Sequence, residues 1–172
     1  MKKILIIISF FLLFCSKTYA ETVKEIIVSG NKRVSEETIK VYGEIEINKD
    51  YQDSDLNNIV RNLFSTDFFE DVNVTLNNNV LKINVKEYPV INQLVFVGEK
   101  SNRYIEQIKK SIKLKQKGSF IKSQILKDTQ LIKSLYQDLG FSFANVDAKF
   151  ENVTKDIVNL TFFVERGDKL KN

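Results

Sequence analysis

Two pairs of acidic residues are the side chains most suited by type and spacing to acid–base chemistry. Glu36 and Glu37 are adjacent, and Asp53 and Asp55 are two positions apart. A general acid–base pair needs two such groups that converge on a pocket. Both pairs instead fall where helices are expected to begin, and carboxylates there stabilise the first turn by capping and through the helix dipole. We therefore interpret all four as structural.

Other side chains that commonly act as nucleophiles, bases or metal ligands are scarce. The chain has no histidine, and its one cysteine is Cys15. Without further thiols or imidazoles there can be no disulfide, no thiolate or imidazole metal site and no Cys–His nucleophile pair. No P-loop, nucleophile elbow or metal-ligand cluster occurs either. The sequence predicts a protein that is not an enzyme and that has no cofactor and no metal.

The first 20 residues have the pattern of a secretory signal peptide. Lys2 and Lys3 precede an apolar run at 4–14, and "SKTYA" supplies small residues before a cleavage site that follows Ala20. The run is too short to span a hydrocarbon core of ~30 Å as a helix. We expect cleavage, with a retained N-terminal anchor as the alternative. A lipid anchor on Cys15 is disfavoured, because bulky Phe14 precedes it.

The charge of the chain changes when this segment is removed. Lys2, Lys3 and Lys17 lie in it, so 23 of the 26 basic residues remain against 22 acidic ones. The pI of about 9.0 is therefore no indication of nucleic-acid binding. No stretch of 18 apolar residues follows Ala20, so no further membrane-spanning helix is expected.

The remaining sequence uses one pattern twice. Each copy has an apolar strand, a glycine, a short helix, a linker, an amphipathic helix and two strands in which apolar and polar residues alternate. The strands and the amphipathic helix are predicted at 23–32, 56–64, 72–76 and 81–85 in the first copy, and at 91–100, 125–139, 144–150 and 158–164 in the second. Ser35, Asp53 and Ser123 are the predicted N-caps. Each copy thus reads β-α-α-β-β, an α+β unit with two helices on one face of a three-stranded sheet.

Glycines mark the corners of this pattern. Gly30 and Gly98 follow the first strand of each copy, where a positive φ or a close backbone approach is expected. Gly140 is predicted to end the second amphipathic helix as its C′ residue.

Three other residues complete the structural predictions. Phe69 and Phe141 stand between the second helix and the next strand of each copy, where we expect them to fill the gap between helix and sheet. Pro89, in "KEYPV", is the only proline. Because proline lacks an amide donor and restricts the preceding residue, it suits a short, stiff joint between two units.

These features resemble a known domain family. A strand ending in "GNK" or "GEK", two helices, the corners "LFSTDFFEDVNV" and "LYQDLGFSFANV", and a hairpin ending in "VKEYP" or "VERGD" are similar to POTRA (polypeptide-transport-associated) domains. The pair behind a signal peptide resembles the first POTRA domains of the BamA-type outer-membrane protein assembly factor family. The resemblance implies two tandem POTRA domains with mixed sheets, at 21–88 and 89–168, with 169–172 as a tail or truncated linker.

The resemblance also implies a location and partners. It implies the periplasm of a Gram-negative bacterium and binding of unfolded outer-membrane proteins, assembly-complex lipoproteins or periplasmic chaperones. The family places such domains before a membrane β-barrel, which this sequence lacks up to Asn172. We expect either a piece of a longer protein, held at the outer membrane, or a stand-alone periplasmic adaptor. The POTRA region of a two-partner secretion protein or of an FtsQ-type division protein is the alternative.

By the same resemblance, the second strand of each unit lies at a sheet edge. An edge strand has unpaired N–H and C=O groups that can bind an extended peptide with little sequence preference. The predicted peptide-binding residues are Val72, Asn73, Val74, Thr75 and Leu76 in the first unit, and Phe143, Asn145, Asp147 and Lys149 in the second.

Overall fold

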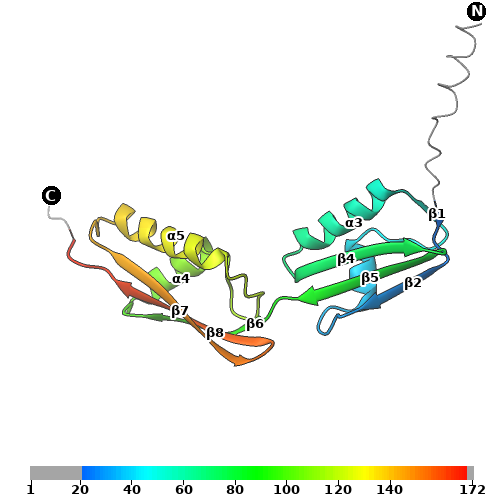
Figure 1. Cartoon of the computed structure of the whole chain (residues 1–172). Coiled ribbons are helices and arrows are strands. Elements are labelled where there is room, and N and C mark those ends of the chain that lie inside the picture. Colours follow the sequence, from blue (N-terminus) through cyan, green and yellow to red (C-terminus); the bar gives the residue numbers. More distant parts are fainter. Residues whose placement is uncertain (1–20, 170–172) are drawn as a thin grey trace, which may run out of the picture.

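A computed structural model describes residues 21–169. The predicted signal peptide, and all of the predicted tail except Lys169, lie outside them. The chain forms two units in sequence (Figure 1). The first contains β1 (Glu21–Thr22), β2 (Glu25–Ser29), α2 (Glu36–Tyr42), β3 (Asp50–Tyr51), α3 (Asp53–Ser65), β4 (Phe69–Asn77) and β5 (Val80–Glu87). The second contains β6 (Val90–Val97), α4 (Asn102–Ser111), α5 (Gln124–Asp138), β7 (Asn145–Thr154) and β8 (Ile157–Glu165).

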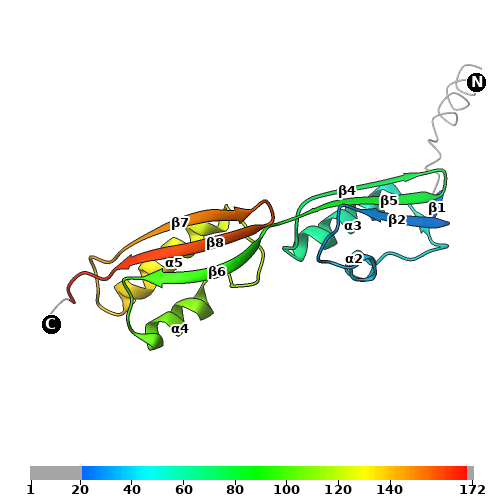
Figure 2. The same ribbon diagram turned by 90° about the horizontal axis from the view of Figure 1, so that it is seen from below.

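Each unit is built on a three-stranded mixed sheet, and the predicted α+β fold is confirmed. The strand order is β2-β5-β4 in the first unit and β6-β8-β7 in the second. In each sheet the last strand is central, parallel to the first strand and antiparallel to the second. The two helices of each unit lie on one face of its sheet (Figure 2). Among the described residues, no helix is long and apolar enough to cross a bilayer.

The core of each unit follows the predicted periodicity. On the central strands, Leu81, Ile83 and Val85 of β5 and Val158, Leu160, Phe162 and Val164 of β8 are buried. Ile59 and Leu63 of α3 and Ile132 and Tyr136 of α5 pack over them. Phe69 is buried, and the ring of Phe141 packs edge-on against Tyr136 at a centroid distance of 6.1 Å.

The helices differ from the prediction in three details. Phe64, predicted in the buried stripe, is 40% exposed, because Leu63 occupies the buried position four residues after Ile59. Helix α3 begins at Asp53, so Gln52 rather than Asp53 is its N-cap. Ser123 precedes α5 but makes no capping hydrogen bond, because its own backbone is already helical, whereas Ser35 accepts from the N–H of Thr38 as expected.

A two-stranded sheet that the sequence did not indicate closes one end of the first unit. Strand β1 pairs antiparallel with β3, a segment predicted as linker. The side chain of Asn79 donates to the carbonyl oxygen of Thr22 at 2.6 Å, and Tyr51 is buried beneath. Two-residue strands are too short to show any periodicity, which explains why the sequence did not predict this sheet.

Gly30 and Gly98 both meet the conditions expected of them. Their φ angles are +84° and +91°. A Cβ atom on Gly30 would lie 2.0 Å from the carbonyl oxygen of Val85, and one on Gly98 would lie 2.1 Å from that of Val164. At each place the first strand leaves the sheet directly against the backbone of the central strand. Gly140, the C′ residue of α5, has a φ of +92°.

Two acidic residues are buried in the second unit. Asp128 is fully buried on α5, and it accepts hydrogen bonds from the backbone N–H groups of Lys113 (3.0 Å) and Leu114 (2.8 Å) in the loop between α4 and α5. Glu99 follows β6 and accepts from the hydroxyl of Tyr136 at 2.6 Å. Burial, together with this hydrogen bond, raises the pKa of Tyr136.

Each residue at the joint between the two units is hydrogen-bonded through its backbone to one of the units. The N–H of Tyr88 donates to the carbonyl oxygen of Phe68 in the first unit at 3.0 Å, and the carbonyl oxygen of Pro89 accepts from Phe120 in the second at 2.7 Å. Val90 continues directly into β6, and its backbone N–H donates to the carbonyl oxygen of Asp156 at 2.9 Å. The chain therefore passes from one unit to the other between Tyr88 and Pro89, two residues whose backbone angles are restricted.

Glu87, the last residue of β5, holds the loop after β2 against this joint. Its Oε1 accepts from the backbone N–H groups of Lys32, Arg33 and Val34 at 2.7–3.0 Å, and its Oε2 accepts from Nε of Arg33 at 3.0 Å. Partial burial acts to raise the pKa of Glu87. The backbone donors and the Arg33 guanidinium outweigh that effect, so the pKa lies below its ordinary value of 4.5.

Replacing Glu87 with glutamine should lower the free energy of unfolding at pH 7 by about 1–2 kcal/mol, since the charge-assisted bonds are lost. Because folding depresses the pKa, the wild-type advantage is complete above about pH 4.5 and disappears as the pH falls through the folded-state pKa. Urea unfolding of both proteins, at pH 7 and at a pH below the folded-state pKa of Glu87, measures this difference. Glu70→Gln, which removes an exposed ion pair with Lys86, is the control and should cost under about 0.5 kcal/mol. An equal loss for Glu87→Gln at both pH values would contradict the linkage.

Candidate functional site

Two of the four acidic residues with the spacing for acid–base chemistry, Glu36 and Asp55, have structural partners. Glu36 forms an ion pair with Lys40 at 2.9 Å, one turn along α2. Asp55 accepts the backbone N–H of Gln52 at 2.9 Å and caps the start of α3. Within residues 21–169, no group of three or more His, Cys, Asp and Glu side chains could hold a metal ion. The sheet edges, where the sequence predicts peptide binding, are described next.

Strands β4 and β7 each lie at a sheet edge. Among residues 21–169, each pairs with one neighbour only, β4 with β5 and β7 with β8. The predicted residues Val72 to Leu76 all lie in β4. On β4 the side chains of Val72, Val74 and Leu76 are buried or half-buried beneath the helices, whereas Asn73 and Thr75 face solvent.

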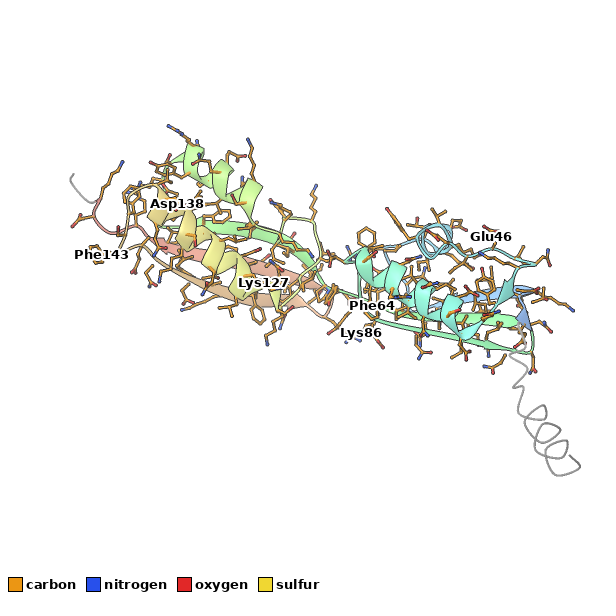
Figure 3. All side chains as sticks on the ribbon, turned by 90° about the horizontal axis from the view of Figure 1, so that it is seen from above. Glu46, Phe64, Lys86, Lys127, Asp138 and Phe143 are labelled. Atoms are coloured by element: carbon orange, nitrogen blue, oxygen red, sulfur yellow. The ribbon has the colours of Figure 1, made fainter. Side chains whose placement is uncertain are left out.

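Phe143 does not belong to the second edge strand, contrary to the prediction. Strand β7 begins at Asn145, and Phe143 lies in the turn before it, 75% exposed. The N–H of Ala144 bonds to the carbonyl oxygen of Phe141 at 3.0 Å, which holds this segment in a turn. Phe143 projects at the far end of the second unit (Figure 3). Asn145, Asp147 and Lys149 lie in β7 and are exposed.

One hydrogen bond identifies which backbone groups of β7 point outward. The N–H of Ala148 donates to the side chain of Asp147 at 2.8 Å, so it does not bond to β8. In an antiparallel pair, every second residue directs its N–H and C=O away from the partner strand. The outward groups are therefore those of Val146, Ala148 and Phe150, whereas the backbones of Asp147 and its alternate neighbours face β8. The predicted residues Asn145, Asp147 and Lys149 lie on this edge strand, and they alternate with the residues whose backbone groups point outward.

Phe150 is an apolar contact point on this edge. Its side chain is 38% exposed, its ring lies 5.0 Å from that of Phe120, and Nζ of Lys122 lies 5.5 Å from its centroid. A peptide strand added to β7 would place side chains of the same face beside this ring. By contrast, the carboxylate of Asp147 covers one outward N–H, as charged residues often do on edge strands.

Comparison with known proteins shows to which family this chain belongs. A sequence model of POTRA, described as "Surface antigen variable number repeat", matches residues 21–88 and again 89–167, nearly all of the described chain. The chain belongs to the POTRA family. The two matches meet between Tyr88 and Pro89, and each contains one of the two sheets.

Two relatives with similar sequences are outer membrane protein assembly factors. The protein is 31% identical over 130 residues to the outer membrane protein assembly factor BamA of Neorickettsia risticii, which covers 74% of this chain and 17% of that protein. It is 25% identical over 152 residues to BamA of Neisseria meningitidis serogroup B, which covers 87% and 19%. The chain thus spans less than a fifth of the length of these relatives. These are POTRA domains of the BamA type.

The fold is also that of a solved structure. The N-terminal domain of Omp85 from Thermosynechococcus elongatus superposes with a TM-score of 0.57 at 17% identity, over 84% of this chain and 63% of that one. This likeness concerns the arrangement of the elements alone.

The second POTRA domain differs from the first in the exposed surface of the helix that packs on the edge strand, α5 on β7 and α3 on β4. Ile59 and Leu63 of α3 and Ile132 and Tyr136 of α5 fill the same buried positions, so Leu126 and Leu131 of α5 correspond to Asp53 and Asn58 of α3. The two leucines are 69% and 45% exposed. They line an open hollow of about 560 Å³ on α5, the helix that packs on β7.

Proposed function

We propose that this POTRA pair is the periplasmic receptor part of a BamA-type outer-membrane protein assembly factor, and that it binds extended segments of unfolded outer-membrane proteins at the edge of β7. The relatives named above are assembly factors for outer membrane proteins, and this supports the client class. Assembly lipoproteins and periplasmic chaperones are further partners of the proposal. This function requires no catalytic groups; backbone hydrogen-bonding groups and an apolar surface are sufficient for it.

The observation that carries the proposal is the outward backbone of Val146, Ala148 and Phe150. Backbone hydrogen bonds add a strand without reading its sequence, which suits a receptor with many clients. The half-exposed ring of Phe150 favours clients that alternate apolar and polar residues, the pattern of a strand that faces two environments. The first domain has the same kind of edge at β4 but offers polar residues where α5 offers Leu126 and Leu131.

Substitution of Ala148 by proline tests the proposal. Proline removes an outward N–H without removing any bond to β8, so the sheet should persist. The affinity for a fluorescent peptide of alternating apolar and polar residues should fall about tenfold, measured by anisotropy. Asp147→Ala uncovers the same N–H and should raise the affinity.

Val74→Pro, at the corresponding position of β4, is the matched control. It should leave the affinity within about twofold of wild type if the second domain is the receptor. Unchanged binding in the Ala148→Pro variant, with wild-type circular dichroism, would refute binding at β7. Loss on Val74→Pro alone would move the site to the first domain.

A further inference from the structure

A dense run of lysines begins in the last turn of α4 and continues into the segment that leads to α5. Residues 109–117, "KKSIKLKQK", contain five lysines, and no acidic residue occurs between Glu106 and Asp128. All five lysines are exposed. The chain after the predicted cleavage site has a nearly balanced charge, so this segment, which we call the lysine loop, concentrates positive charge that the rest of the molecule does not share.

The fold holds this loop in one conformation. Ile112 and Leu114 are 2% and 1% exposed, so they anchor the loop in the core and turn Lys113 and Lys115 outward. Asp128 fixes the backbone of the same stretch through the N–H groups of Lys113 and Leu114. The end of the loop is tied to β6, since the backbone N–H of Lys117 donates to the carbonyl oxygen of Ile91 at 2.7 Å.

Lys117 has a backbone conformation that lysine adopts at a cost. Its φ is +65°, in the left-handed region where glycine or asparagine is favoured. Most other non-glycine residues with positive φ in the described chain are Asn or Asp, at positions 48, 67, 78 and 79. A strained backbone that carries an unsuited side chain points to a use for that side chain. Here the side chain contributes the last charge of the loop.

The charges of the loop are largely available. Lys109 pairs with Glu106 at 3.0 Å and Lys113 with Asp67 at 2.6 Å, both as exposed ion pairs of little energy. Within residues 21–169, Lys110, Lys115 and Lys117 form no ion pair, and the ammonium group of Lys115 bonds only to the carbonyl oxygen of Lys109. The loop therefore presents a cationic surface on which, among the described residues, three of the five lysines have no acidic partner.

The composition of the loop indicates the class of ligand. Sites that recognise one carboxylate or phosphate by geometry favour the bidentate fork of arginine, and the loop contains none. Several lysines, each a point charge on a flexible stem, suit a broad anionic surface, to which they add attraction charge by charge. We infer that the lysine loop is an electrostatic docking site for a membrane surface that carries anionic lipid headgroups.

The position of the loop is compatible with peptide binding at the same time. Helix α4, from which the loop leaves, lies on the β6 side of the second domain, and β7 is the opposite edge (Figure 2). A membrane against the loop would leave the outward backbone of β7 open. The inference stands on the lysines alone and does not depend on binding at β7.

Vesicle co-sedimentation tests the inference. The purified protein should bind vesicles of phosphatidylglycerol and phosphatidylcholine, but not phosphatidylcholine alone, and binding should fall at least about tenfold between 50 and 500 mM salt. The triple variant Lys110→Gln/Lys115→Gln/Lys117→Gln should bind about 100-fold more weakly, at roughly fivefold per lysine. These side chains are exposed, so circular dichroism should show an unchanged fold.

The control removes the same charge elsewhere. Lys24→Gln/Lys82→Gln/Lys133→Gln replaces three exposed lysines outside the loop and should change vesicle binding by about twofold at most. Equal binding by the two triple variants, or wild-type binding that ignores lipid charge, would overturn the inference. Loop-dependent binding to polyglutamate without binding to anionic vesicles would also overturn it, and would assign the loop to an acidic polypeptide instead.

Discussion

Substitution of Asp128 by alanine is expected to lower the free energy of unfolding by about 3–4 kcal/mol. The carboxylate is fully buried and accepts the N–H groups of Lys113 and Leu114 together with Nε2 of Gln124, at 2.8–3.0 Å. Alanine leaves the buried N–H of Leu114 and two partly buried donors without their acceptor, and a buried donor left unpaired is costly. Urea unfolding followed by circular dichroism measures the loss.

Two variants sharpen this experiment. Asp128→Asn keeps one acceptor oxygen, so it should lose less than alanine. Asp138→Ala alters an exposed carboxylate on the same helix (Figure 3) and should leave stability unchanged or raise it by under about 0.5 kcal/mol, since a negative charge at a helix C-terminus is unfavourable to the helix dipole. If Asp128→Ala proves as mild as Asp138→Ala, the carboxylate is not the anchor of the lysine loop.

Substitution of Gly98 by alanine is expected to cost about 3 kcal/mol or more. The new Cβ would lie 2.1 Å from the carbonyl oxygen of Val164, and the φ of +91° is itself strained for alanine. The obstacle is backbone of the central strand, so no side chain can move aside. The clash must instead separate β6 from β8, and thermal unfolding should report the loss.

Val97→Ala is the matched control for this substitution. Val97 is the neighbouring residue, ends the same strand and is 45% exposed, so truncating it should cost less than about 1 kcal/mol. A Gly98→Ala variant with the stability of Val97→Ala would show that β6 leaves the sheet by another path.

Periodicity predicted the architecture because each unit buries one face of a sheet under two helices. In strands such as β5 and β8, apolar and polar residues alternate. In α3 and α5, apolar stripes that include Ile59 and Ile132 mark the face that packs on the sheet. Both patterns can be seen in the sequence alone. The glycines that follow β2 and β6 were identifiable for a similar reason, since a glycine directly after an apolar strand seldom has another use.

What the sequence did not reveal depends on contacts between distant residues. Asp128 stands three residues after Ile125 and four before Ile132, on the buried stripe, and only that spacing hints that its charge is inside. Glu87 meets the loop that follows β2 more than 50 residues away, and no local pattern announces the pairing. At the candidate site, side-chain alternation located β7 but not its outward amides, because backbone direction depends on register with β8.

The strand order also determines how each domain responds to tension. The first strand enters where its domain begins, the last strand leaves where it ends, and the two run parallel as neighbours, β2 with β5 and β6 with β8. A pull on the two ends of a domain therefore drags adjacent strands past each other along their length. All the hydrogen bonds between them resist this shear together, whereas strands peeled from one end would yield one bond at a time. With a joint of two restricted residues, the pair is suited to carry load along the chain while both domains stay folded.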